Sequence, residues 1–234
     1  MDTAEIIKAA RDGDLNLVKQ LLDDGADINA VNGSGASALI LAAEKNHFEV
    51  VKALVESGAD LNIETKMGGT ALNRAAETGN VEMMEYLFDK GVKLGSLALI
   101  MAARSGNLDA VKLLVEKGAD VDYQQRWGHT ALMVAAKNGH GEVIKYLLSE
   151  GANVYLRDKN GDTAMMIAME NDQEDIAMIL KRAGAKTEVK PKKKKAAPVV
   201  TEDDEDEEDS MDDTPDVDDL VSDEDAPDEI DLDD

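Results

Sequence analysis

Apolar positions recur along this chain in six copies of one pattern: a pair of small residues, a polar turn, an apolar run and a glycine-led turn. The glycines that close the copies are Gly25, Gly58, Gly91, Gly118, Gly151 and Gly184. They lie 33, 33, 27, 33 and 33 residues apart. A period near 33 residues indicates one supersecondary unit stacked on copies of itself. Such an array offers an extended surface, so the pattern favours a binding function over a catalytic pocket.

Residues 126–158 show the fold that we expect of one copy. Thr130 suits an N-cap position, where its hydroxyl accepts a hydrogen bond from the first turn of a helix. Small and apolar residues follow at helical spacing until Gly139 and His140 break that helix. A second apolar helix then runs up to Gly151, a residue that favours the left-handed conformation found after helix ends. The predicted unit is helix, turn, helix and a projecting, hairpin-like loop.

A short motif opens the first helix in four of the copies. It reads Ser37-Ala38-Leu39-Ile40, Thr70-Ala71-Leu72-Asn73, Thr130-Ala131-Leu132-Met133 and Thr163-Ala164-Met165-Met166. The motif resembles the Thr-Pro-Leu-His sequence of ankyrin repeats, and Gly139-His140 resembles the Gly-His turn of that family. The resemblance covers residues 3–185 and implies an all-α solenoid of six helix-turn-helix units with projecting loops. It also implies protein binding, without naming the partner.

The 27-residue interval is the one break in the period. Only Val92-Lys93-Leu94-Gly95-Ser96 connects Gly91 to Leu97, where the other copies have 11 residues. We predict that the third and fourth units stack directly and leave a notch in the row of loop tips. Two interpretations stay open: tolerated variation in a loop, or a notch with a function.

The resemblance also implies where a partner docks, because ankyrin-like proteins generally bind through loop tips and the exposed face of the inner helices. The candidate partner-binding residues carried over in this way are Lys66, Met67, Arg104, Arg126, Trp127, His129, Lys137 and Lys159. Trp127 is the only tryptophan, and tryptophan and arginine are enriched at binding hot spots. The alternative is that its ring folds onto a neighbouring loop, against Tyr123 or Met67. The basic candidates favour an anionic partner if they are more than solvated side chains.

Charge divides the rest of the chain from this array. Of the net charge of −25, residues 201–234 contribute 21 acidic side chains and no Lys or Arg. Residues 186–200 form a Lys-rich, Pro-containing linker. We therefore predict three parts: the repeat domain 1–185, the linker 186–200 and a disordered acidic tail 201–234. The tail is either a solubilising extension, an anchor for short motifs, or a guard over the basic positions of the array.

Several classes of function find no support in the sequence. The chain has no cysteine, and its three histidines match no zinc pattern, so we expect no metal site, no cofactor and no catalytic residues. His47 and His140 fall at the repeat's structural turn, where an imidazole commonly bonds to the backbone. The acidic start lacks the features of a signal peptide, and no apolar run reaches membrane-span length, so we expect a cytoplasmic protein. In a eukaryote, Lys192-Lys193-Lys194-Lys195 would resemble a nuclear import signal.

The function predicted from the sequence is a non-catalytic, monomeric adaptor or scaffold for a protein partner, with the acidic tail as a modulator. The alternative is a chaperone or competitor whose tail binds basic, nucleic-acid-binding proteins. Direct nucleic-acid binding is not expected, because the tail carboxylates would repel phosphates.

Overall fold

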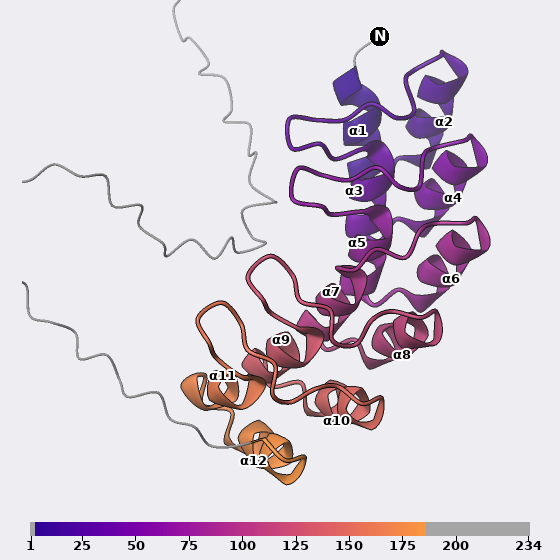
Figure 1. The fold of residues 1–234 in the computed structure, drawn as a ribbon. Helices are drawn as coiled ribbons and strands as arrows, with labels where there is room; N and C mark the ends of the chain where they lie inside the picture. The colour runs from indigo at the N-terminus through magenta and orange to yellow at the C-terminus, as the bar shows by residue number, and fades with distance from the viewer. Residues whose placement is uncertain (1–2, 186–234) are drawn as a thin grey trace, which may run out of the picture. The chain divides into compact units, whose positions relative to one another are not determined.

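The computed structural model describes residues 3–185, which form twelve α-helices in six consecutive pairs (Figure 1). All of them belong to the unit Met1–Lys190. The inner helices are α1 (Thr3–Asp12), α3 (Ala38–Glu44), α5 (Ala71–Thr78), α7 (Ala98–Arg104), α9 (Ala131–Lys137) and α11 (Ala164–Glu170). The outer helices are α2 (Leu15–Asp23), α4 (Phe48–Glu56), α6 (Val81–Asp89), α8 (Leu108–Glu116), α10 (Gly141–Ser149) and α12 (Glu174–Arg182). The predicted linker 186–200 and tail 201–234 lie outside the described residues.

The inner helices stack on one another along the array, and each outer helix packs against its own inner helix and its outer neighbours (Figure 1). This two-layer arrangement confirms the all-α solenoid of six units. The small pairs explain how the inner helices approach so closely: Ala42 and Ala43, and their counterparts Ala75 and Ala76, are fully buried between neighbours. Larger side chains from the outer helices fill the space behind them, as Leu54 does for α4. One continuous core therefore runs through all six repeats.

Hydroxyl side chains begin four of the inner helices, as the sequence motif predicts. The hydroxyls of Ser37, Thr70, Thr130 and Thr163 accept hydrogen bonds from the backbone N–H three residues later. This cap satisfies one of the free donors of the first turn, so substitution by alanine costs about 1 kcal/mol in comparable helices. Among the inner helices from α3 to α11, the exception is α7, whose N-cap residue Leu97 has no side-chain cap.

Residues that begin several of the outer helices join their repeat to the one before it. His47 Nε2 lies 3.0 Å from the carbonyl oxygen of Arg11, and His140 Nε2 lies 2.7 Å from that of Arg104. Asn107 takes the same place and donates to the carbonyl oxygen of Glu77 at 2.7 Å. The prediction that His47 and His140 are turn residues whose imidazoles bond to the backbone is therefore confirmed.

Projecting loops connect most of the repeats, but not the third to the fourth. Figure 1 shows them between α2 and α3, α4 and α5, α8 and α9, and α10 and α11. Between α6 and α7 the chain passes directly from one repeat to the next (Figure 1). The predicted notch in the row of loops is thus confirmed as a structural feature.

A series of equivalent side-chain hydrogen bonds joins the glycine-led turns of neighbouring repeats, and it is interrupted at the notch. Asn29 Oδ1 accepts from the N–H of Asp60 at 2.9 Å, and Asn62 Oδ1 accepts from the N–H of Lys93 at 3.0 Å. Beyond the notch, Asp122 Oδ1 accepts from the N–H of Asn153 at 2.8 Å. The third repeat has Gly95 at the acceptor's position, so its interface with the fourth repeat lacks this bond.

We expect that Gly95→Asn stabilises the array by roughly 1 kcal/mol more than Gly95→Ala, because only asparagine restores an acceptor to this series of bonds. The backbone at Gly95 does not have the positive φ that would penalise a side chain. A Cβ there meets only Asn73 Oδ1, at 3.8 Å. Urea unfolding followed by circular dichroism measures the difference. Equal stability of the two variants would contradict the expected bond.

Candidate partner-binding surface

Each projecting loop is a tight hairpin that ends in a four-residue turn. In the loop of Trp127, the N–H of Gln125 donates to the carbonyl of His129 at 3.0 Å, and the N–H of Gly128 donates to the carbonyl of Gln125 at 2.7 Å. The loop of Met67 closes through the equivalent bonds from Thr65 and Gly68. The glycine of the turn has a positive φ in both loops, +83° at Gly128 and +77° at Gly68. The turn places the two residues before the glycine at the tip.

Backbone hydrogen bonds join the loop tips in two pairs. In the first tip pair, residues 31–37 and 64–70, the N–H of Lys66 donates to the carbonyl of Ser34 at 2.9 Å. In the second tip pair, residues 124–130 and 157–163, the N–H of Lys159 donates to the carbonyl of Trp127 at 3.0 Å. The notch separates the two pairs, so the row of tips is two platforms rather than one continuous edge.

Side chains tie the second tip pair together further. His129 Nε2 lies 3.3 Å from Oδ2 of the buried Asp158, and His129 Nδ1 lies 3.3 Å from Gln125 Nε2. Gln124 Nε2 donates to the carbonyls of Gly128 at 2.7 Å and of Arg157 at 2.9 Å. His129 was predicted to bind a partner, and the structure places its imidazole in this connection between the loops. The ties fix how the two tips of the pair sit relative to each other.

Trp127 lies at the tip of the second pair with 37% of its surface exposed. The guanidinium carbon of Arg126 lies 5.6 Å from the centroid of its ring, and the ammonium nitrogen of Lys159 lies 5.5 Å from it. Both distances fall within the range of cation–π attraction. Met67, which the alternative interpretation placed against the ring, belongs to the first tip pair and is 53% exposed. The tip thus combines an apolar surface with two positive charges.

The inner-helix face carries the remaining basic candidates. Arg104 and Lys137 occupy equivalent positions at the ends of α7 and α9. Lys137 is exposed, whereas Arg104 is half-buried and its Nη1 atom is enclosed without a hydrogen-bond partner among the described residues. The structure therefore presents Lys137 to a partner more openly than Arg104.

A buried ion-pair network on the same face was not predicted from the sequence. The Arg74 side chain, only 7% exposed, lies with Nη1 2.8 Å from Oε2 of Glu77 and with Nε 3.5 Å from Oε2 of Glu44. The shorter contact is a hydrogen bond, and the longer one lacks hydrogen-bond geometry. A signal was present: the equivalent positions of four other repeats hold Leu41, Met101, Val134 and Ile167, and only the terminal first repeat also has a basic residue there, Lys8.

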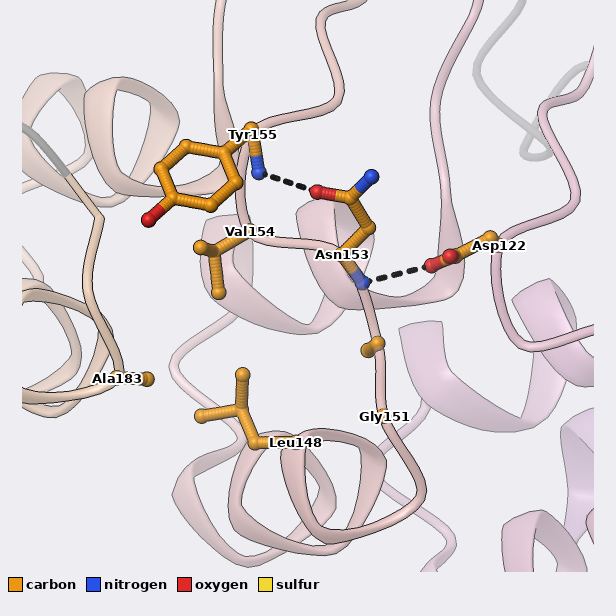
Figure 2. Close-up of a pocket in the computed structure, with 8 residues that line it drawn as sticks. Asp122, Leu148, Gly151, Asn153, Val154, Tyr155 and Ala183 are labelled. Carbon is orange, nitrogen blue, oxygen red and sulfur yellow. Dashed lines mark hydrogen bonds between the residues drawn. The ribbon is translucent and has the colours of Figure 1, made fainter.

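One open hollow lies between the C-terminal ends of α10 and α12, at the base of the loop that follows α10. It has a volume of about 640 Å³ and includes Leu148, Val154, Tyr155 and Ala183 in its lining (Figure 2). Its polar groups already bond within the protein: Asn153 Oδ1 accepts from the N–H of Tyr155 at 2.9 Å (Figure 2). The hydroxyl of Tyr155 donates to the carbonyl of Gly184 at 3.1 Å. The hollow is where repeats join, and its groups show no catalytic arrangement.

Within residues 3–185, no group of three or more His, Cys, Asp and Glu residues is placed to hold a metal ion. Over the same part of the chain, no helix is long and apolar enough to cross a membrane.

Comparison with known proteins identifies the repeat itself. A family model described as "Ankyrin repeats (3 copies)" matches residues 6–98 and again residues 99–191. The ankyrin repeat domain of human ASB11, known from a crystal structure, is similar with a TM-score of 0.70 and 26% sequence identity. That match covers 79% of this chain and 85% of the other. No curated protein matches the sequence. Since 580 chains of solved structures match, the likeness speaks for a widely used architecture rather than for one partner.

Proposed function

The chain belongs to the ankyrin repeat family, and from that premise we propose that it is a non-catalytic adaptor or scaffold that binds a protein partner through its loop tips and inner-helix face. Ankyrin repeats generally mediate protein–protein interaction. The proposal is finer than that, because it assigns the binding to particular residues. It includes the monomeric state and the cytoplasmic location expected from the sequence.

The observation that carries the proposal is the second tip pair. Trp127 is exposed there although a large apolar side chain on a tight turn gains nothing in stability from contact with water. Its loop is hydrogen-bonded to the neighbouring loop, so the ring is presented at a fixed place. Aromatic and arginine side chains held in this way are typical of binding hot spots.

The acidic tail, residues 201–234, is the proposed modulator. The array offers exposed basic side chains at Arg126, Lys137 and Lys159, and the tail carries 21 acidic residues. If the tail is disordered, as the sequence predicts, its 34 residues have a root-mean-square span of roughly 30 Å, and more when the charges repel. We propose that the tail competes with the partner for these basic positions. The alternative is that the tail itself binds basic proteins and the array does not.

Affinity capture from native cells tests the adaptor. We expect the full chain to retain a specific partner that Trp127→Ala loses by tenfold or more, since a hot-spot residue dominates its interface. Met178→Ala is the matched control, because Met178 is an exposed apolar residue on the outer helix α12. Retention of every captured partner by Trp127→Ala would rule out the tip as the binding site.

A salt series separates the two roles of the tail. If the tail guards the array, deletion of residues 201–234 should tighten partner binding at low salt and have little effect at high salt. If the tail is the binding element, its deletion should abolish capture of basic proteins, and the tail alone should capture them. Unchanged affinity at low salt would exclude the guarding role.

A further inference from the structure

We propose that the partner presents to the second tip pair an extended segment in which acidic and apolar side chains occupy every second position. This inference rests on the proposed binding function and names the chemistry of the partner. It is drawn from three features of the tip: its unpaired cations, its exposed ring and the hydrogen bonds that hold it in place.

The cations of the tip are available to bind an anion. Arg126 and Lys159 are exposed, and neither forms an ion pair with any carboxylate within residues 3–185. The acidic residue next to Lys159 in the sequence, Asp158, is buried and lies against His129. Lys145, by contrast, lies 2.6 Å from Oε1 of Glu142. A carboxylate arriving from solvent would therefore meet two positive charges without displacing an internal partner.

The position of the Trp127 ring relative to the two cations indicates how far an apolar side chain of the partner should lie from its acidic side chains. The cationic atoms of Arg126 and Lys159 lie 5.6 Å and 5.5 Å from its centroid. In an extended chain, side chains two residues apart lie on one face, about 6.6–6.8 Å from each other. A segment with an apolar residue over the ring and acidic residues two positions away thus fits the spacing between ring and cations.

The tip is held ready for such a segment. The bond from the N–H of Lys159 to the carbonyl of Trp127 and the bond from Gln124 Nε2 to the carbonyl of Arg157 join the loops before any partner arrives. Binding groups that are already ordered lose less conformational entropy on association. The first tip pair differs, since Gly33 and Ser34 face Lys66 and Met67 there and provide one cation and no aromatic ring. The proposal is therefore specific to the second pair.

An acidic protein segment fits the molecule better than a nucleic acid, which also combines anions with stacking surfaces. Nucleic-acid binding draws most of its affinity from phosphate neutralisation by many basic side chains. The second tip pair offers only two unpaired cations around its ring, on a chain with a net charge of −25. Two charges and one ring suit a short peptide motif.

The single tryptophan of the chain makes the inference directly measurable. The full chain is titrated with a synthetic peptide of repeating aspartate-serine-leucine-serine units while the fluorescence of Trp127 is followed. We expect a saturable change in emission that weakens as salt is added. Replacing the leucines of the peptide by serine should weaken binding by tenfold or more. Equal binding of the leucine-free peptide, or tighter binding of a single-stranded oligonucleotide, would overturn the proposal.

Charge reversal at one lysine supplies the matched pair of variants. Lys159→Glu should weaken binding of the aspartate-leucine peptide by tenfold or more. Its fold should be retained, because Lys159 is exposed and its contact with Trp127 O uses the backbone N–H. Lys117→Glu makes the same change of charge and also removes a cation from a ring, that of Phe88, but on the outer side of the fourth repeat. It should bind the peptide within twofold of the parent chain.

The two proposals fail in different ways. If the peptide does not change the emission of Trp127, or if Lys117→Glu weakens binding as much as Lys159→Glu, the acidic-apolar partner is wrong. Loss of captured protein on Trp127→Ala would still support the adaptor in that case. If the peptide binds as expected but capture is unaffected by Trp127→Ala, the adaptor proposal fails instead.

Discussion

Replacing both Glu44 and Glu77 by alanine is expected to lower the free energy of unfolding by about 3 kcal/mol, because it leaves the buried guanidinium of Arg74 without an anion. Arg74 is almost fully enclosed, and its two partners are themselves only 16% and 24% exposed. The loss should lie at the lower end of the range for fully buried pairs, since the partly exposed edge admits some solvent. Equilibrium urea unfolding, followed by circular dichroism, measures it.

Arg74→Met is the matched control, and it should change the stability by less than about 1 kcal/mol, because replacing a buried ion by an apolar side chain removes its desolvation cost. The array itself supports this expectation, since the equivalent positions in the second, fourth, fifth and sixth repeats hold Leu41, Met101, Val134 and Ile167. Adding Arg74→Met to the double glutamate variant should restore most of the lost stability. If Arg74→Met alone cost as much as the double variant, the network would be a net source of stability and our account of it would be wrong.

Arg74 also shows why part of the surface could not be predicted from the sequence. The 33-residue period places the position on the inner-helix face, but it does not say that Glu44 and Glu77 converge on it. Glu77 lies one helical turn away, whereas Glu44 comes from the preceding repeat. The contact depends on how closely α3 and α5 pack, and that is a property of the stack rather than of one repeat.

The fold could be predicted from the sequence because each repeat contains the residues that cap its helix and form its turn and its loop. Thr130 was identified as an N-cap, His140 as a structural turn residue and the 27-residue interval as a missing loop, and all three are confirmed. These signals are local, so one copy of the pattern is enough to predict them. The family and the solenoid follow from their repetition.

The contacts between neighbouring loops could not be predicted from the sequence, because they depend on how the repeats stack and not on the residues of one repeat. Trp127 was placed correctly at a loop tip, but its pairing with Lys159 arises between two repeats. His129 is a partner-binding candidate from its place at a loop tip, and the structure gives it a neighbour, Asp158, in the next loop. Whether the candidate residues bind a partner remains a prediction.

Gly128→Ala is expected to destabilise the array by about 3 kcal/mol, because it combines backbone strain with a clash between two loops. Gly128 has a φ of +83°, a conformation that costs an L-residue about 1 kcal/mol or more. A Cβ there would lie 2.9 Å from Asp158 Cα and 3.0 Å from the backbone nitrogen of Lys159. Both obstacles are backbone atoms, so no side-chain rotation relieves them. Urea unfolding of the variant measures the loss.

Gly68→Ala is the control that the notch provides. Gly68 occupies the same position of the same turn, with a φ of +77°, but no loop follows it across the notch. A Cβ at Gly68 meets only Cδ1 of Leu97, at 3.4 Å. This variant should therefore show the strain alone, about 1 kcal/mol. Equal losses at the two glycines would mean that the contact between the second pair of loops contributes nothing measurable.

The same comparison connects stability to binding. Since Gly128 lies between Trp127 and the backbone of Asp158, a clash there must be relieved by separating the two loops. The separation would stretch the bond from the N–H of Lys159 to the carbonyl of Trp127 and draw a cation away from the ring. Gly128→Ala should therefore weaken binding at the second tip pair even at temperatures where the array stays folded. Gly68→Ala should not, because the first and second tip pairs share no loop.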